Sequence, residues 1–341
     1  MIRAFVELSH ESLELAQAEA VSAAEALGGR AVVEEAAIPG LIPLEVPESS
    51  ALRKLADRLA LARRCFIPLP TPEGLVAAAR REGGRGGSAM FRRIGRPSGG
   101  DADEGVLACG RAYKLGGGTV DLDRPFRRFW IAKDPQGREH LLEEVAAVDR
   151  SAPTRRRMPL LPFRRPVSLP PRLARAAANL ARVAPGDRVL DPFLGTGALL
   201  AEAGLLGGRP YGIDRDPAMV RGALQNLAHL GVTAEELLVG DARDVEFSDP
   251  STRFSAIVTD APYGRSSSTG GAAAAVLVEE VMGRWSERLV PDGRLLLIAP
   301  EGVQAHPKSC ALRFRVAVRV HRSLTREFRL YERTGLTGSS C

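Results

Sequence analysis

Cysteine, lysine and aromatic residues are scarce in this chain of 341 residues. Its four cysteines, Cys65, Cys109, Cys310 and Cys341, lie far apart, so the spacing of a zinc site is absent and we expect free thiols. No apolar run approaches the ~20 residues of a membrane-spanning helix. The N-terminal residues lack the charged region, long apolar core and cleavage site of a signal peptide. We therefore expect a cytoplasmic protein without a metal site, long enough for two domains.

Most of the chain has almost no net charge. Residues 1–150 carry 21 Lys and Arg against 22 Asp and Glu, and residues 183–341 carry 18 against 19. The segment 151–182 holds eight arginines and no acidic residue, so it carries the whole excess. A basic strip between two nearly neutral parts indicates a polyanionic partner that touches both, although a solvated basic linker would have the same composition.

Residues 1–150 show short, mixed local elements. An alternation of apolar and polar residues predicts a strand at 2–8, and apolar residues at helical spacing predict a helix that begins at Ser9 or His10 and ends at Gly28. We expect an α+β region with further strands at 30–38, 41–46, 65–69, 89–94, 119–122 and 128–132, and helices at 50–62, 75–81 and 101–114.

After a basic linker at 151–168, the pattern changes to regular alternation of strands and helices. This alternation predicts a doubly wound α/β domain at 169–341, with a mostly parallel sheet and an antiparallel end formed by 314–321 and 325–331. The other expected strands are 188–191, 210–214, 236–239, 254–260 and 293–298, and the helices are 171–183, 197–206, 216–230 and 272–289.

The first motif is a glycine-rich turn after the first strand of this domain. It runs from Asp191 and Pro192 to Gly195, Thr196 and Gly197. Glycine lets the backbone approach a ligand closely at the carboxyl end of a strand. A dinucleotide fingerprint would need a third small residue where Leu200 stands, and no Gly-Lys-Ser/Thr follows that would make a phosphate loop.

Two acidic residues follow at the ends of the next two strands. Asp214, beside Arg215, is placed to accept hydrogen bonds from both ribose hydroxyls of an adenosyl group. NAD and S-adenosylmethionine both contain such a ribose, so this residue does not distinguish the two cofactors. Asp241, followed by Ala242, is a candidate acceptor for the adenine amino group, and an ordinary turn residue is the alternative.

The fourth motif, Asp260-Ala261-Pro262-Tyr263, ends the fourth strand and resembles the active site of amino-group methyltransferases. An exocyclic amino nitrogen is a poor nucleophile because its lone pair is delocalised into the ring. The carboxylate of Asp260 and the carbonyl of Ala261 would accept its two N–H groups and direct the lone pair. Pro262 favours an extended Ala261 and has no N–H of its own. Tyr263 offers a flat face for an extruded base.

On these motifs the chain resembles the archaeal tRNA guanosine-10 N2-methyltransferase family over nearly its full length. Residues 260–267 resemble the active-site signature, with Ala261 in place of a more usual proline. Residues 162–181 resemble the segment that leads into the catalytic domain and helps form the methyl-donor site. Leu161 stands where an arginine is usual there, and Arg164 where an aromatic residue is common. Residues 91–95 and 120–125 resemble a THUMP module, which with a ferredoxin-like domain binds the 3′ end of tRNA.

The resemblance implies a Rossmann-like methyltransferase that uses S-adenosylmethionine and acts on tRNA, not on DNA. It implies donor binding at 191–197, 214–215 and 241–242, and RNA contacts from arginines, which are Arg92, Arg93, Arg155, Arg156, Arg157, Arg164, Arg165 and Arg265. We expect a monomer. Alternatives are a methyltransferase for guanosine 6 of tRNA, rRNA guanine or DNA adenine, a nicotinamide-dependent oxidoreductase, and a non-catalytic RNA-binding protein. Mono- and dimethylation, and the need for a protein partner, stay open.

Overall fold

The computed structural model describes residues 1–32, 38–69, 73–80, 87–95, 103–165, 168–262, 271–321 and 324–334. Contacts divide the chain into two compact units. Unit 1 comprises Met1–Leu13, Leu27–Asp57 and Ala62–Asp149, and unit 2 comprises Glu14–Ala26, Arg58–Leu61 and Arg150–Cys341. Helix α1 (Leu13–Glu25) therefore belongs almost entirely to unit 2, although it lies near the start of the chain.

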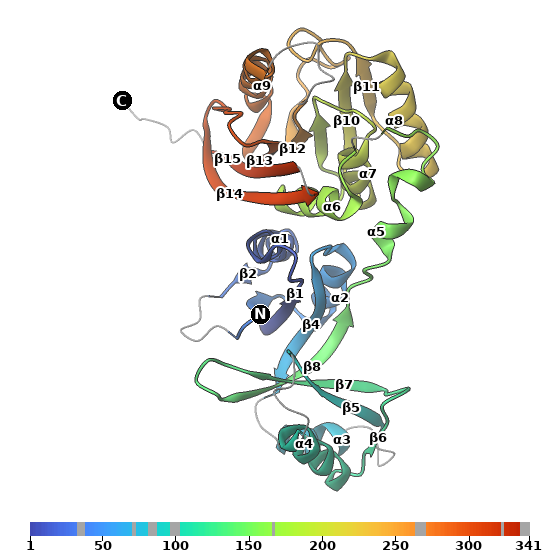
Figure 1. Ribbon diagram of the computed structural model, residues 1–341, viewed down its shortest axis with the longest axis vertical. Helices are drawn as coiled ribbons and strands as arrows, with labels where there is room; N and C mark the ends of the chain where they lie inside the picture. Colours follow the sequence, from blue (N-terminus) through green and yellow to red (C-terminus); the bar gives the residue numbers. More distant parts are fainter. Residues whose placement is uncertain are drawn as a thin grey trace. The chain divides into compact units, whose positions relative to one another are not determined.

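Unit 1 is an α+β unit, as the mixed elements predict. Eight strands of its described part form one sheet in the order β2-β3-β1-β4-β8-β7-β5-β6 (Figure 1). The strands are β1 (Ile2–Leu8), β2 (Arg30–Ala31), β3 (Leu41–Val46), β4 (Ala62–Leu69), β5 (Ser88–Arg93), β6 (Thr119–Val120), β7 (Arg127–Lys133) and β8 (Glu139–Ala147). The helices are α2 (Ser49–Arg58), α3 (Glu73–Arg80) and α4 (Glu104–Leu115).

The core of unit 1 consists of two apolar clusters. Phe5, Phe66 and Trp130 belong to the first, and β1, which pairs antiparallel with both β3 and β4, is buried along most of its length. The second cluster includes Phe91 and Tyr113, whose rings meet edge to face at 5.7 Å between centroids. Packing of this kind holds α3 and α4 on the sheet, since each fully buried apolar side chain stabilises the fold by about 1.5–3 kcal/mol.

Strand β8 (Glu139–Ala147) is absent from the sequence prediction, although it is an inner strand. It pairs with β4 on one side and with β7 on the other. Its sequence, EHLLEEVAA, has no period of two and is rich in residues that favour helices. Pairing on both sides overrides this local preference, because strand propensity depends strongly on context.

Unit 2 has the alternating α/β pattern that the sequence predicts. Seven strands of the described part form one sheet in the order β11-β10-β9-β12-β13-β15-β14 (Figure 1). The strands are β9 (Arg188–Asp191), β10 (Arg209–Asp214), β11 (Glu236–Val239), β12 (Phe254–Asp260), β13 (Leu289–Pro300), β14 (Cys310–His321) and β15 (Leu324–Arg333). The helices are α1, α5 (Ala152–Arg155), η1 (Met158–Leu160), α6 (Pro171–Leu180), α7 (Ala198–Leu205), α8 (Pro217–His229) and α9 (Gly271–Ser286).

The strands from β11 to β13 run parallel, and β15 and β14 close the sheet antiparallel. This confirms the expected fold class and its antiparallel end. Leu190 and Leu297 pack with Trp285 of α9 on one face. On the opposite face, a Cβ added at Gly212 would lie 3.0 Å from Cδ1 of Leu200 in α7. Helices therefore cover both faces, and the carboxyl ends of the parallel strands stay open for a ligand.

Helix α1 is joined to α6 by a buried polar network inside unit 2. Asn179 donates to Glu19 at 2.8 Å and to the carbonyl of Arg58 at 2.8 Å, and it accepts from Nε of Arg58 at 2.9 Å. Glu19 also accepts the backbone N–H groups of Ala60 and Leu61 at 2.9 and 2.8 Å. Burial raises the pKa of Glu19 and lowers that of Arg58 to about 10. The buried polar side chains of this network, Glu19, Arg58 and Asn179, are thus hydrogen-bonded to one another or to the backbone, as burial requires.

Candidate active site

A cavity of about 700 Å³ lies at the carboxyl ends of the parallel strands in unit 2. This is where ligands bind in doubly wound sheets. Residues of all four predicted motifs line it, together with the start of α7, part of α9 and two residues before α6. The lining residues used below are Ser168, Leu169, Asp191, Pro192, Gly195, Thr196, Asp214, Arg215, Asp241, Ala242, Arg243, Asp260, Ala261, Pro262 and Leu277.

The glycine-rich turn joins β9 to α7 in the way its residues predict. Gly195 and Gly197 have φ angles of +52° and +79°, in the left-handed region that residues with a side chain rarely adopt. A Cβ at Gly197 would also lie 3.1 Å from Cβ of Ala223. The turn is fixed to the next strand because Leu194 N–H donates to the carbonyl of Ile213 at 2.8 Å. Gly197 shapes the turn without lining the cavity, whereas Gly195 lines it.

Asp214 ends β10 with its carboxylate held by two backbone groups. Oδ2 accepts from Gly195 N–H and Oδ1 accepts from Asp216 N–H, both at 2.9 Å. Each oxygen keeps a further lone pair. The carboxylate therefore faces the cavity in a fixed orientation, where it can accept from vicinal hydroxyls.

Asp241 lies in the loop after β11 and already has a cationic partner. Its Oδ2 is 2.7 Å from Nη2 of Arg243, and its Oδ1 accepts from the backbone and Nε of the same arginine at 2.9 and 3.0 Å. Hydrogen bonds from Arg243 hold the pKa of Asp241 at about 2. The pair is partly exposed, so it is a weak one. Arg243 belongs to none of the predicted motifs, and it lines the cavity beside Asp241.

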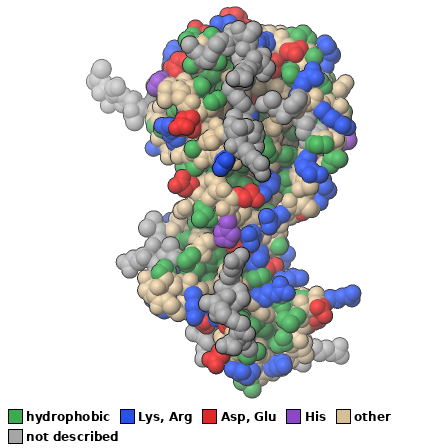
Figure 2. Space-filling model, viewed as in Figure 1, with side chains coloured by type: hydrophobic (Ala, Val, Ile, Leu, Met, Phe, Trp, Pro, Cys, Tyr) green, Lys and Arg blue, Asp and Glu red, His purple; other side chains and the backbone are tan. Residues whose placement is uncertain are grey.

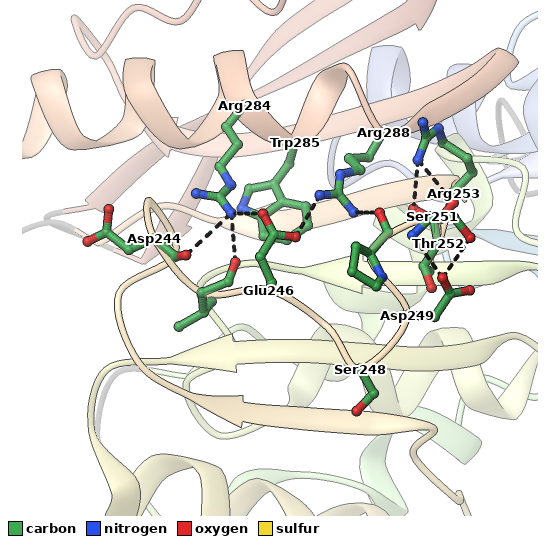
Figure 3. Close-up of polar contacts among 12 residues, drawn as sticks. Asp244, Glu246, Ser248, Asp249, Ser251, Thr252, Arg253, Arg284, Trp285 and Arg288 are labelled. Carbon is green, nitrogen blue, oxygen red and sulfur yellow. Dashed lines mark hydrogen bonds and ion pairs between the residues drawn. The ribbon is translucent and has the colours of Figure 1, made fainter.

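The loop that carries Asp241 and Ala242 is fastened to the end of α9 (Figure 3). Nε1 of Trp285 donates to the carbonyl of Ala242 at 2.8 Å. Figure 3 shows Glu246 between two arginines, and its oxygens lie 2.6 Å from Nη2 of Arg284 and 2.6 Å from Nη2 of Arg288. Arg284 also donates to the carbonyl of Val245 at 2.7 Å. These contacts fix a loop that has no sheet partner of its own.

Asp260 ends β12 with its two carboxylate oxygens in different surroundings. Oδ2 lies 2.5 Å from Nη1 of Arg326 in β15, a residue that the sequence analysis did not single out. Oδ1 is buried and has no hydrogen-bond partner among the described residues. Burial raises the pKa of Asp260 to about 7, and Arg326 opposes this rise. A buried acceptor left unpaired costs about 1–3 kcal/mol, which a ligand with a donor would recover.

The rest of the fourth motif continues along the same wall. Ala261 is buried, and its N–H donates to the carbonyl of Ile298 at 2.8 Å, which extends the pairing of β12 with β13. Pro262 lines the cavity. Tyr263 and Arg265, both expected at the site, lie outside the described residues.

Asp191 brings a further buried carboxylate to the same edge of the sheet. It is 2% exposed, and its Oδ1 accepts from Oγ1 of Thr259 at 2.7 Å and from Phe193 N–H at 3.0 Å. Burial raises the pKa of Asp191 to about 7, and the negative charges of Asp260 and Asp214 add to the rise. An acidic floor of this kind favours a cation in the cavity.

The segment 162–181 reaches the cavity as the resemblance implies, since Ser168 and Leu169 line it. Asn226 of α8 holds this segment in place: it accepts from Phe163 N–H and donates to the carbonyls of Phe163 and Thr196, all at 3.0 Å. A Cβ at Gly222 would lie 2.2 Å from the ring of Phe163. The glycine thus leaves room for the phenyl ring on α8.

Four of the eight arginines in the basic segment bind groups that lie far from them in the sequence. Arg156 and Arg175 each lie 2.7 Å from the carboxylate of Glu202, which is 2% exposed. Arg182 pairs with Glu25 at 2.8 Å, and Arg172 donates to the carbonyl of Ala60 at 3.2 Å. These four side chains therefore stabilise unit 2. The sequence pattern does not predict this, because their partners all lie outside 151–182.

The remaining four, Arg155, Arg157, Arg164 and Arg165, are exposed. The guanidinium of Arg165 lies 4.7 Å from the centre of the Phe163 ring. In unit 1, Arg92 is exposed, whereas Arg93 is 2.8 Å from Glu139 and forms an ion pair with Asp103. On the face drawn in Figure 2, Lys and Arg side chains lie among acidic and apolar ones in both units.

The described residues include free thiols, but neither a cluster of metal ligands nor a helix that could span a membrane. Within the described ranges, no group of three or more His, Cys, Asp or Glu residues is arranged to hold a metal ion. No helix of that part of the chain is long and apolar enough to cross a bilayer. Cys65, Cys109 and Cys310 are free thiols, as predicted, and Cys341 lies outside the described residues.

Comparison with known proteins identifies the family. The profile of the RMKL-like methyltransferase domain matches residues 160–327. The chain is 38% identical over 220 residues to the tRNA (guanine(10)-N2)-dimethyltransferase of Methanothermobacter thermautotrophicus, over 63% of each chain. It is 32% identical over 168 residues to a protein of Methanothermococcus thermolithotrophicus named "Probable tRNA (guanine(10)-N2)-dimethyltransferase", a match over 48% of this chain and 99% of that one. The chain belongs to this family of dimethyltransferases.

A third relative of the family, the tRNA (guanine(10)-N2)-dimethyltransferase of Pyrococcus abyssi, is 41% identical over 177 residues, which are 50% of this chain and 52% of that one. The chain thus matches between half and two thirds of the length of the first and third relatives. The methyltransferase profile begins beside the segment 162–181 and ends just after Arg326. It therefore spans every described residue of the cavity wall.

Proposed function

We propose that this chain transfers a methyl group from S-adenosylmethionine to the exocyclic N2 amino group of a guanosine in tRNA, and that the target is guanosine 10. The products are N2-methylguanosine and N2,N2-dimethylguanosine. The names of the family's members support the substrate. The observation that carries the chemistry is Asp260, which ends β12 at the cavity with one oxygen paired to Arg326 and the other buried and unpaired.

The cavity fits a cationic adenosyl donor. When bound, S-adenosylmethionine supplies an electrophilic methyl group on a positively charged sulfur. Asp191 and Asp260 each have a raised pKa because burial disfavours their charge, and a nearby cation would relieve this. A nicotinamide dinucleotide would instead bring two phosphate charges to the acidic turn, so the same carboxylates argue against the oxidoreductase alternative.

Different residues bind the ribose and the adenine of S-adenosylmethionine. Asp214 accepts the ribose hydroxyls with a carboxylate that Gly195 N–H and Asp216 N–H already orient. Asp241 and Ala242 receive the adenine, in a loop fixed by Trp285. Asp241 can accept a hydrogen bond from the adenine amino group with a carboxylate lone pair that Arg243 does not use. Alternatively, the adenine amino group replaces Arg243, whose ion pair with Asp241 is exposed and weak.

The chemistry at the amino group follows from the two acceptors. Oδ1 of ionised Asp260 accepts one N–H and the carbonyl of Ala261 accepts the other, which localises the lone pair on nitrogen and aims it at the methyl group. Asp260 is also the nearest base for the proton that nitrogen loses after transfer. Most of the rate enhancement then comes from positioning the two reactants in line. Pro262 shapes this wall, and we assign the stacking of the base to Tyr263.

RNA binding in this proposal involves both parts of the chain. Residues 1–150 form an RNA-binding region of ferredoxin-like and THUMP type, 151–168 a basic linker, and 169–341 the catalytic domain. Arg92 and the exposed arginines at 155, 157, 164 and 165 are the best placed to meet phosphates, because Arg93 and Arg156 are neutralised by carboxylates. We also assign a phosphate contact to Arg265.

Methyl transfer to an unmodified tRNA transcript, followed by mass spectrometry of the nucleosides, tests the proposal. We expect N2-methyl- and N2,N2-dimethylguanosine that disappear when guanosine 10 is replaced by adenosine. An Asp260→Ala variant should bind the tRNA and the methyl donor but transfer nothing. Methylation that survives the replacement would move the target to another guanosine. Hydride transfer from a nicotinamide, or the absence of any transfer with both ligands bound, would refute the proposal.

A further inference from the structure

Arg326 is buried in the antiparallel end of the sheet, yet its side chain reaches the last residue of β12. The strand β13 lies between them: Asp260 is opposite Ile298, and Ile298 is opposite Phe328 of β15. Arg326 is two residues before Phe328, so its side chain runs diagonally across β13 to place Nη1 2.5 Å from Oδ2 of Asp260. Arg326 is 2% exposed, and the residues opposite it on the two adjacent strands are Pro300 of β13 and Val318 of β14.

The contact makes the two oxygens of Asp260 unequal. Oδ2 is bound to Arg326, and Oδ1 is the buried oxygen that lacks a partner among the described residues. A carboxylate with one oxygen fixed by an arginine cannot rotate freely about its last bond. The free oxygen therefore keeps one direction, and it does so at the wall of the cavity.

Two further carboxylates lie at the ends of strands on one side of Asp260. Asp191 lies on the neighbouring strand β9, and Asp214 lies beyond it at the end of β10. The facing residues of β13 and α9, such as Ile298 and Leu277, are apolar. Burial raises the pKa of Asp260 to about 7 even though the charge and the hydrogen bond of Arg326 lower it, so Arg326 is a cation that opposes the effect of burial. Without Arg326, Asp260 would be protonated at neutral pH and would offer an O–H where the reaction needs an acceptor.

We propose that Arg326 is a positioning residue for methyl transfer, which keeps Asp260 ionised and turns its Oδ1 toward the amino group of the substrate. This inference rests on the proposed function, since it names what the amino group meets in the site. Arg326 acts through Asp260 and makes no contact with either substrate.

The first test compares Arg326→Gln and Arg326→Lys with the wild type by the pH dependence of kcat. In Arg326→Gln the acidic limb should move up by one to two units, so that kcat at pH 6 falls roughly 10- to 100-fold and recovers by pH 9. The KM for tRNA and the Kd for S-adenosylmethionine should stay within about threefold. Arg326→Lys should keep the limb closer to that of the wild type, since it retains the charge at a shorter reach.

Arg329→Gln is the matched control. Arg329 lies on the same strand with the same 2% exposure, but it pairs with Glu327 and donates to the carbonyl of Val303. Its loss removes an equally buried charge without touching Asp260, so the pH profile should not move. A profile of Arg326→Gln that runs parallel to the wild type, or that matches Arg329→Gln, would overturn the inference.

A second test does not depend on activity. The difference in unfolding free energy between the wild type and Asp260→Asn, measured from pH 5 to 9, follows the ionisation of Asp260. Repeating it with Arg326→Gln in both proteins should move the midpoint to higher pH. If the wild type methylates no guanosine, the proposed function fails, while this midpoint still decides whether Arg326 keeps Asp260 ionised. A midpoint that stays in place refutes the inference.

Discussion

Replacing Asp191 by Asn should make the ligand-free protein more stable at alkaline pH. The carboxylate is 2% exposed, and burial together with Asp260 and Asp214 raises its pKa to about 7. A rise from the usual value of ~3.9 corresponds to about 4 kcal/mol of disfavoured ionisation, at 1.36 kcal/mol per unit. Asn keeps the oxygen that accepts from Thr259 and Phe193. The gain should therefore be about 1–3 kcal/mol, after the amide group has been accommodated.

The size of the stabilisation by Asp191→Asn changes with pH in a defined window. A carboxyl group whose pKa is raised by folding costs nothing below the unfolded value of ~3.9, where it is protonated in both states. Its cost grows as the pH rises toward 7 and is complete above it. The stabilisation by Asp191→Asn should thus be absent near pH 4, grow between pH 4 and 7, and stay constant at pH 8 and 9.

Chemical denaturation at pH 4.5, 6 and 8 measures this difference, with the exposed Asp244→Asn as the control variant. Titration calorimetry should show the opposite effect on the ligand. The variant lacks the carboxylate of Asp191, which would attract the positively charged sulfur of S-adenosylmethionine. The affinity for S-adenosylmethionine should therefore fall more than the affinity for S-adenosylhomocysteine, whose sulfur is neutral. A variant that is less stable than the wild type at pH 8, or a difference that does not change with pH, would refute this reasoning.

The remaining predictions concern the supports of the site and the RNA contacts. Asn226→Ala removes three hydrogen bonds around Phe163 and Thr196, so unfolding free energy should fall by about 2–4 kcal/mol and the KM for S-adenosylmethionine should rise, with Gln225→Ala unchanged in both. Trp285→Phe leaves the carbonyl of Ala242 without its donor and should weaken the binding of S-adenosylhomocysteine several-fold; equal affinity would show that this anchor does not shape the adenine site. Replacing the exposed arginines 164 and 165 by Ala should lower tRNA affinity and reduce the slope of log K against log salt by about 1.5–2, and an unchanged slope would exclude phosphate contacts there.

Much of the catalytic unit follows from local sequence patterns. The glycine-rich turn and the acids at 191, 214, 241 and 260 were all expected at the carboxyl ends of strands, and they line one cavity. The position of these residues can be predicted because parallel strands joined by helices have their carboxyl ends at the same edge of the sheet, independently of the loop conformations. Neither the role of Asp241 nor that of Ala261 is decided by their position, so both remain predictions.

The missing parts depend on contacts between distant segments. Strand β8 reads as a helix former and becomes a strand only by pairing on both sides. Arg326 is one of several arginines in an alternating strand, and nothing in that pattern tells which one reaches Asp260. The charge of 151–182 likewise says nothing about Glu202, which binds two of its arginines.

The assignment of α1 and Arg58–Leu61 to unit 2 limits how this protein can be cut or recombined. A fragment that begins at residue 150 would lack Glu19 and Arg58, and Asn179, with no exposed surface in the full chain, would lose the partners of its side chain. Arg294, 6% exposed, would lose Ser22 and Glu25 as well. Exchange of the N-terminal region between relatives would have to preserve these side chains. Residues 150–341 are therefore not a module that could be joined to a different N-terminal region unless that region also supplied these side-chain contacts.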